Sequence, residues 1–155
     1  MSPVGDEDQQ AFTDLPALWD IEHIKQLKAR YWRYIDQREW TLFRDIFTPD
    51  CYFKYGPRED HFVIGTDAIV AFIRSWIDPG TTVHHGHAPE ITITGRRTAK
   101  GIWALYDHVD AQAPRGRAKF EGYGHYYEEY EKGHDEKWRI SSSRLTRLRV
   151  DQPTT

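Results

Sequence analysis

Hydrophobic residues in the first half of the chain recur every three or four positions, the spacing of one face of an amphipathic helix. The first such stretch contains Leu18, Ile21, Ile24, Leu27, Tyr31, Tyr34 and Ile35. A shorter second stretch covers residues 42–47 and is expected to end at Thr48-Pro49-Asp50. A third covers residues 69–77, with Thr66 as its expected N-cap. The pattern therefore predicts three helices before residue 80.

From residue 81 onward, aromatic and β-branched residues form long runs that are separated by turn residues. These runs predict strands over residues 81–94, 98–109, 120–131 and 137–150. A short strand is also expected at residues 51–55, between the second and third helices. Long consecutive strands favour an antiparallel meander with the helices packed on one face. The expected fold class is therefore α+β.

Length and charge refine this picture. A chain of 155 residues is expected to form one domain, here residues 15–150, with a flexible acidic arm at residues 1–14 and a tail at residues 151–155. The net charge of −3 disfavours a nucleic-acid partner. The single cysteine, Cys51, excludes an internal disulfide, and no apolar run is long enough to span a membrane. With no secretory signal visible either, we expect a cytoplasmic protein with no membrane partner.

The densest group of ionisable residues is His84, His85 and His87, followed by Glu90. Strand alternation places His85 and His87 on one face, where Glu90 could supply a third metal ligand. The competing interpretation is a strand whose histidines on one face are solvated. The spacing from His87 to Glu90 is shorter than in histidine-rich metal-binding barrels, and three helices precede the sheet. We therefore expect no metal.

A second set of residues has the chemistry of general acid–base catalysis, namely Tyr31, Asp36 and Asp107 together with the histidines. Each also has an ordinary structural interpretation: Tyr31 as a core tyrosine, and the aspartates as solvated carboxylates at element ends. Alternation places Asp107 on the same strand face as Trp103. No nucleophile motif, glycine-rich phosphate loop or HExxH motif is present. Acid–base groups are therefore the chemistry that the sequence supports.

Several stretches carry a resemblance to a known family: Tyr31 through Asp36, the Gly-His-x-Pro-Glu-Ile-Thr-Ile run at residues 86–93, and Tyr130-Glu131-Lys132. Over residues 19–148 the chain resembles the SnoaL-like group of the nuclear transport factor 2-like (cystatin-like) superfamily, and within it the bacterial bile acid 7α-dehydratases. The resemblance implies a cone, with N-terminal helices packed on a strongly curved, mostly antiparallel sheet. It also implies a homo-oligomer, either a trimer or a dimer.

The resemblance also implies an activity, the cofactor-independent elimination of water from a hydrophobic, ketone-bearing hydroxysteroid. The family's catalytic residues correspond to Tyr31, Asp36, His84 and Asp107, and its substrate-binding arginine corresponds to Arg147. From the residues alone, Arg147 could equally be a surface cation. We expect Trp103 and Tyr55 to line the pocket with it. The alternatives are a ketosteroid-isomerase-like proton transfer and a non-catalytic binding or subunit role. Residues 55–61 and 111–119 depart from the family pattern, and such loops close the cavity in this fold.

Overall fold

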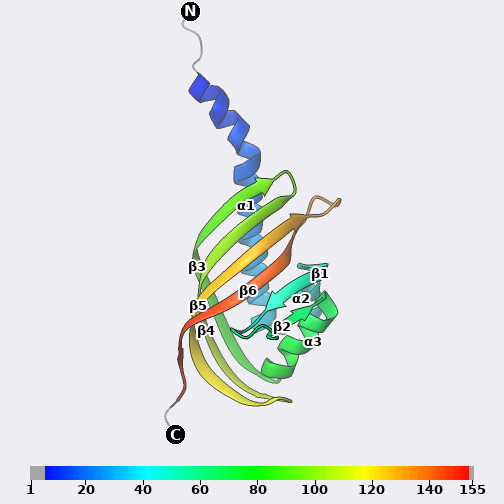
Figure 1. The fold of residues 1–155 in the computed structure, drawn as a ribbon, viewed down its shortest axis with the longest axis vertical. Helices are drawn as coiled ribbons and strands as arrows, with labels where there is room; N and C mark the ends of the chain where they lie inside the picture. Colours follow the sequence, from blue (N-terminus) through cyan, green and yellow to red (C-terminus); the bar gives the residue numbers. More distant parts are fainter. Residues whose placement is uncertain (1–5, 154–155) are drawn as a thin grey trace, which may run out of the picture.

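The computed structural model describes the backbone of residues 6–153 and the side chains of residues 15–153. Helix α1 (Asp6–Asp36) has 31 residues and runs behind the sheet, projecting beyond it at its N-terminal end (Figure 1). Residues 6–14 of the expected arm are helical and continue into the rest of α1, and residues 1–5 lie outside the described residues. Acidic residues at positions 6–8 favour a helix start here because they complement the helix dipole. Among the described helices, none is both long and apolar enough to cross a membrane.

The segment after α1 differs from its prediction. Helix α2 (Trp40–Arg44) ends before the Thr48-Pro49-Asp50 stretch that was expected to stop it, and strand β1 (Phe47–Lys54) includes this stretch, starting four residues earlier than expected. The pairing of β1 is irregular between Phe47 and Tyr52, which leaves room for a proline that cannot donate a ladder hydrogen bond. Strand β2 (Phe62–Ile64) was not predicted, because three residues are too few to show a periodicity.

Helix α3 (Thr66–Ile77) follows a glycine in the left-handed half of backbone space, Gly65 with φ of 92°. Gly65 occupies the N-cap position, so the prediction that Thr66 caps the helix was wrong. The Thr66 hydroxyl instead donates to the carbonyl oxygen of Thr48 at 2.7 Å, which fastens the helix start to β1. The buried residues Ile69, Ile73 and Ile77 belong to the predicted apolar face.

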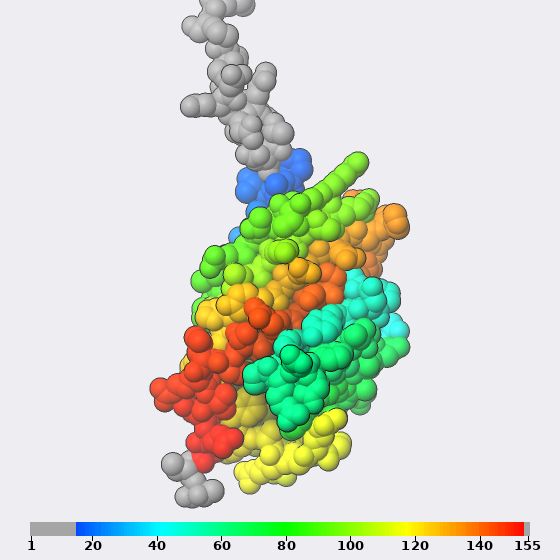
Figure 2. Space-filling model, in the orientation of Figure 1, coloured from blue at the N-terminus to red at the C-terminus, as the bar shows by residue number. Residues whose placement is uncertain are grey.

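Four long strands complete one sheet: β3 (Gly80–Gly95), β4 (Thr98–Ala113), β5 (Gly116–Lys132) and β6 (Trp138–Asp151). The strand order is β2-β1-β6-β5-β4-β3, and all pairings are antiparallel except that of β1 with β6. The meander and the α+β class match the expectation. The sheet curves strongly around α1, and the β4–β5 hairpin lies beside α3 at one end of the molecule (Figures 1 and 2).

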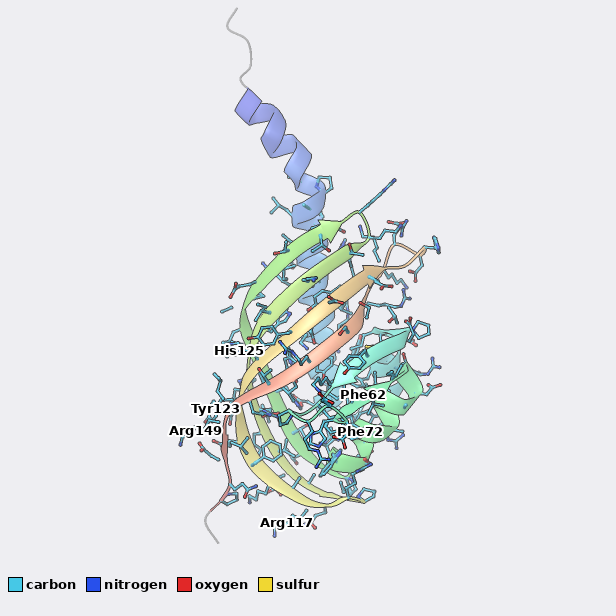
Figure 3. All side chains as sticks on the ribbon, in the orientation of Figure 1. Phe62, Phe72, Arg117, Tyr123, His125 and Arg149 are labelled. Atoms are coloured by element: carbon cyan, nitrogen blue, oxygen red, sulfur yellow. The ribbon has the colours of Figure 1, made fainter. Side chains whose placement is uncertain are left out.

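The inner face of the sheet forms the core with α1 and α3. Along β4, every second side chain is buried, including Trp103, Leu105, Asp107 and Val109. Gly86 on β3 lies so close to Trp32 of α1 that any side chain at this position would collide with the indole ring. Figure 3 shows the opposite arrangement for Tyr123, His125 and Arg149, which project from the outer side of the sheet, away from Phe72 of α3.

Candidate active site

A histidine–aspartate dyad joins the end of α1 to the start of β3. The His84 Nδ1 atom lies 2.6 Å from Asp36 Oδ1, and the His84 backbone N–H donates to Asp36 Oδ2 at 2.8 Å. Because a carboxylate can only accept, we assign the ring proton to Nδ1, which leaves Nε2 as the free basic nitrogen. The His84 side chain is 7% exposed and that of Asp36 is 23% exposed, so both lie at the inner side of the sheet.

The Asp36 carboxylate is held by a third hydrogen bond, from the Thr82 hydroxyl to Oδ1 at 2.9 Å. That hydroxyl in turn accepts a hydrogen bond from Arg38 at 2.8 Å. Arg38 has a φ of 60°, the left-handed conformation that ends many helices, and its guanidinium also donates to carbonyl groups at both ends of the α3–β3 connection. Arg38 therefore ties the end of α1 to the strand that carries His84.

A second carboxylate lies next to the dyad. His84 on β3 pairs in register with Asp107 on β4, and both face the interior, so their Cβ atoms are direct cross-strand neighbours. Asp107 receives two parallel hydrogen bonds from the Arg147 guanidinium, each 2.6 Å long. The Asp107 partner raises the pKa of Arg147 even though burial works in the opposite direction. The sequence left open whether Arg147 is a surface cation, and the structure pairs it, partly buried, with the buried Asp107 carboxylate.

Tyr31 is buried on the face of α1 that meets β5. Its ring packs against Tyr126, Phe43 and Phe47, with the Tyr126 centroid at 5.8 Å. Burial and the negative charge of Glu128 raise the pKa of Tyr31, whereas a hydrogen bond between the Tyr31 and Tyr126 side chains lowers it. The charge of Asp107 also raises the pKa of Tyr31, by less than burial and Glu128 do. The four predicted catalytic residues therefore converge on one region of the interior.

The two aromatic residues expected to line the pocket lie elsewhere. Trp103 is buried deeper in the core, where it contacts Trp32 edge-on at 5.4 Å and donates its indole N–H to the Tyr130 hydroxyl. Tyr55 packs between Phe72 of α3 and His61, with ring centroids at 4.3 and 5.2 Å. No described contact joins either residue to the dyad.

Sequence reasoning missed a fully buried ion pair. Lys28 Nζ lies 2.6 Å from Glu128 Oε1, and both side chains are 0% exposed. Lys28 was not among the residues expected on the buried face of α1, although its spacing of four residues from both Ile24 and Trp32 is that of this face. Glu128 alternates with Tyr126 and Tyr130 along β5, and this spacing places it on the buried face of the strand.

The remaining histidines of the cluster, His85 and His87, lie on the outer face of β3. In the part of the chain that the structure describes, no group of three or more His, Cys, Asp or Glu side chains is placed to hold a metal ion. Cys51 is buried, and burial raises the pKa of its thiol to about 12. A thiol with so high a pKa is a poor nucleophile near neutral pH.

A groove of about 1340 Å³ opens on a different part of the molecule, between α1, α2, β1 and the β5–β6 hairpin. Its lining includes Arg30, Leu42 and Trp138, and none of the predicted site residues contributes to it. The dyad lies apart from this groove, at the end of α1 and on β3, and the core beside it is closely packed.

Comparison with known proteins places this site in a family. A model of the SnoaL-like domain matches residues 16–144, which include α1 from residue 16 onward, the whole dyad and Asp107. The chain belongs to the SnoaL-like family. The fold class and the cone expected from the sequence are those of this family and of cystatin-like structures. The SnoaL-like match ends shortly before Arg147, so that residue is placed by the structure alone.

Relatives of this SnoaL-like chain include a probable cyclase of Gibberella zeae, 27% identical over 134 residues, which represent 81% of this chain and 89% of the relative. Among solved structures, a hexachlorocyclohexane dehydrochlorinase has a TM-score of 0.77 at 17% identity, covering 91% of this chain and 93% of that one. A provisionally assigned scytalone dehydratase of Novosphingobium aromaticivorans has a TM-score of 0.75 at 18% identity, covering 90% and 91%. At these identities, the structural matches show the shared fold.

Proposed function

We propose that this SnoaL-like protein is a cofactor-independent lyase that eliminates water from a hydroxylated ketone. The observation that carries the proposal is the Asp36–His84 dyad, in which the carboxylate binds Nδ1 and leaves Nε2 free on the inner side of the sheet. A histidine held in this way is a general base, because its partner fixes the tautomer and stabilises the imidazolium that forms. Asp107 and Tyr31 beside it supply the polar groups that such a reaction needs.

In the proposed reaction, His84 Nε2 removes a proton from the carbon next to the substrate carbonyl. The C–H electron pair forms an enolate, and Tyr31 donates a hydrogen bond to the enolate oxygen as negative charge develops there. The enolate then re-forms the carbonyl and expels the hydroxyl group on the neighbouring carbon. The imidazolium of His84 returns its proton to that hydroxyl, so that water leaves and the base is restored. Every proton and electron pair in this cycle is accounted for without a cofactor.

Asp107 is given a supporting part in this reaction. Its carboxylate is fully engaged by Arg147, so the pair adds little net charge next to the imidazolium of His84. We assign Asp107 the task of holding Arg147 at the inner wall, where the guanidinium borders the substrate. Tyr31 and Asp107 are both buried, so a substrate reaches them only when the aromatic packing around Tyr31 opens.

The substrate proposed for this reaction is a hydrophobic, polycyclic ketone of the steroid or bile acid type. The support for this class is the resemblance of residues 19–148 to bile acid 7α-dehydratases and the aromatic character of the interior around Tyr31. The dehydratase and dehydrochlorinase among the structural neighbours bear the names of elimination reactions, which supports the reaction type. The same resemblance supports assembly as a homotrimer, which sedimentation equilibrium of the purified protein would test.

A second candidate is an intramolecular ring closure, favoured by the probable cyclase of Gibberella zeae among the relatives. Both reactions begin with the same enolate, which in a cyclase attacks a second carbonyl carbon instead of expelling a hydroxyl group. A double-bond isomerisation would differ only in the carbon to which His84 returns the proton. The three outcomes therefore depend on the substrate more than on the dyad.

Mass spectrometry of products separates these candidates. The purified protein would be incubated with a panel of hydroxysteroid ketones, their thioesters and smaller polyketide-like ketones. Elimination removes the mass of one water, whereas isomerisation and simple ring closure leave the mass unchanged. The His84→Ala variant is the control, and it should reduce any true turnover by at least about 10²-fold. Turnover that continues at the normal rate in His84→Ala would overturn the proposed mechanism.

A further inference from the structure

The buried ion pair of Lys28 and Glu128 lies directly behind the proposed acid. The Lys28 ammonium is 3.8 Å from the ring centroid of Tyr31 and 3.6 Å from that of Tyr126. It thus lies between two tyrosine rings while it donates to Glu128 at 2.6 Å. An ammonium has three N–H donors, and here one contacts a carboxylate while the two aromatic faces are near enough to receive the other two.

The partners of Glu128 are those that a carboxylate acceptor needs. Its Oε1 atom accepts hydrogen bonds from Lys28 and from the Ser143 hydroxyl at 2.9 Å, and its Oε2 atom accepts from the Tyr130 hydroxyl at 2.6 Å. The Tyr130 hydroxyl accepts in turn from the Trp103 indole N–H at 2.8 Å. Three donors directed at two oxygens suit a carboxylate, which has no proton of its own to place. Such a fully satisfied network is the condition under which a charged pair is tolerated in a core.

Packing alone gives no reason for charges at these positions. Replacing a buried ion pair with apolar residues of similar volume is often neutral or stabilising, because charged groups must be stripped of water. Burial does lower the pKa of Lys28, and the charge of Glu128 works against this. The Lys28–Glu128 pair holds an ammonium against the ring of Tyr31. This arrangement points to a role in the chemistry of the Tyr31 phenol.

We propose that Lys28 is a positioning residue for Tyr31: its ammonium, kept charged by Glu128, withdraws electron density from the Tyr31 ring and strengthens the hydroxyl as a hydrogen-bond donor to the enolate oxygen. This inference rests on the function proposed above for Tyr31. A cation close to the face of a phenol favours the electron-rich phenolate over the neutral ring, since the attraction grows with negative charge on the ring. It acts where water is excluded and screening is weak. Lys28 touches neither substrate nor reacting atoms and acts through Tyr31.

Other charged and titratable groups face Tyr31 from the surrounding elements, and the test must keep them unchanged. The cation nearest to the ring is Lys28, on the same helix. The groups contributed by the strands are Cys51 of β1, Asp107 of β4, Tyr126 and Glu128 of β5, and Arg147 of β6.

The test replaces Tyr31 with trifluorotyrosine, whose ring fluorines bring phenol ionisation into a readily measured pH range and provide a ¹⁹F signal. In Lys28→Met, which keeps the unbranched stem, the midpoint of the Tyr31 titration should rise by about one pH unit or more, a tenfold change in the ionisation constant. The double variant Lys28→Met/Glu128→Gln removes both charges and leaves no buried ion unpaired. Because loss of the Glu128 charge by itself lowers the pKa of Tyr31, the midpoint of the double variant is compared with that of Glu128→Gln alone and should lie above it. This comparison decides the matter if the single Lys28 variant does not fold.

Lys100→Met is the matched control. Lys100 of β4 forms an exposed ion pair with Glu129 of β5 at 3.3 Å. Its replacement should therefore leave the midpoint of the Tyr31 titration unchanged. A midpoint that fails to rise in both Lys28 variants, each compared with its own reference protein, overturns the proposal. The titration is measured without substrate. It therefore tests the effect of Lys28 on Tyr31 independently of the proposed reaction.

Steady-state kinetics provide a second test of the role of Lys28. With a substrate in hand, Lys28→Met should lower kcat by about 10-fold to 10²-fold with little change in KM, because a donor that matters only in the transition state is weakened. In the Tyr31→Phe background, the same substitution should have almost no further effect, because its target is gone. Equal losses in both backgrounds would show that Lys28 supports only the fold.

Discussion

Asp36 contacts both the backbone N–H and the imidazole of His84, so one carboxylate fixes the position and the orientation of the base. An Asp36→Asn substitution keeps the size and an acceptor oxygen but removes the charge that stabilises the imidazolium. We expect kcat to fall about 10³-fold to 10⁴-fold, with a melting temperature close to that of the unsubstituted protein. Kinetics combined with thermal unfolding would check this. A loss of activity that merely follows a loss of fold would contradict it.

Thr82 connects Asp36 to Arg38, and its removal tests whether that link matters. The isosteric Thr82→Val variant loses the hydroxyl that donates to Asp36 and accepts from Arg38. We expect a modest loss of activity of about 10-fold, because Asp36 keeps its two contacts with His84 but gains freedom to rotate. Thr98→Val, at an exposed threonine whose hydroxyl contacts only Thr94, serves as the control. An equal effect of both substitutions on kcat would contradict the proposed support.

The Asp107–Arg147 pair predicts an asymmetry between single and double substitutions. Arg147→Met leaves a buried carboxylate without its partner and should lower the free energy of unfolding by about 3 kcal/mol. The double variant Asp107→Leu/Arg147→Met removes both charges and should recover most of that loss. Denaturant unfolding of the three proteins would measure both values. Equal stabilities for the single and the double variant would show that the pair is not energetically coupled.

Alkaline pH is expected to destabilise the protein in a defined window. Burial raises the pKa of Tyr31, Tyr126 and Tyr130 above 10.0, and that of the Cys51 thiol from 9.0 to about 12. The native state therefore keeps protons that the unfolded chain releases, so stability is full below pH 9 and falls as the pH rises through these values. Each such group lowers the free energy of unfolding by about 1.4 kcal/mol per pH unit within its window. Chemical denaturation from pH 8 to pH 11 measures the slope, and Tyr126→Phe should reduce it.

Gly86 is expected to tolerate no side chain. A Cβ atom at this position would overlap the Trp32 ring, so Gly86→Ala must displace α1 or the strand. We expect a loss of about 1–3 kcal/mol in the free energy of unfolding, the range found for overpacked cores. Gly116→Ala is the contrasting control, because open space surrounds that position and only its left-handed backbone, φ of 115°, opposes the change. A Gly86→Ala variant as stable as the unsubstituted protein would contradict the tight helix–sheet contact.

Much of the fold could be predicted because it depends on local periodicity. The buried face of α1 at Ile24, Leu27 and Ile35 and the alternation along β4 both follow from the spacing of apolar residues. The strand start at Phe47 and the short strand β2 could not be predicted in this way, because both are defined by pairing with distant segments. The N-cap of α3 was missed for a related reason, since the Thr66 hydroxyl makes a long-range contact.

The residues of the candidate site could be predicted where they belong to a family motif. They could not be predicted where a polar residue occupies a core position. His84 and Asp36 were expected as partners, and the structure joins them. The burial of Lys28 was not predicted, because lysines are rarely buried and its partner Glu128 is 100 residues away in the chain. Arg38 gave no periodic signal, because its role depends on a left-handed backbone and on carbonyl groups of distant segments.

The division of the site between helix and sheet has a consequence for how such a protein can change. Tyr31 and Asp36 belong to one rigid helix, whereas His84 and Asp107 belong to adjacent paired strands. The turn of the β4–β5 hairpin, around residues 113–116, and α3 lie together at one end of the molecule and supply none of these four residues. Exchanging that end between related chains should alter which molecules are accepted while leaving the proton-transfer geometry unchanged. The substrate could therefore change through one part of the chain while the reaction is preserved by another.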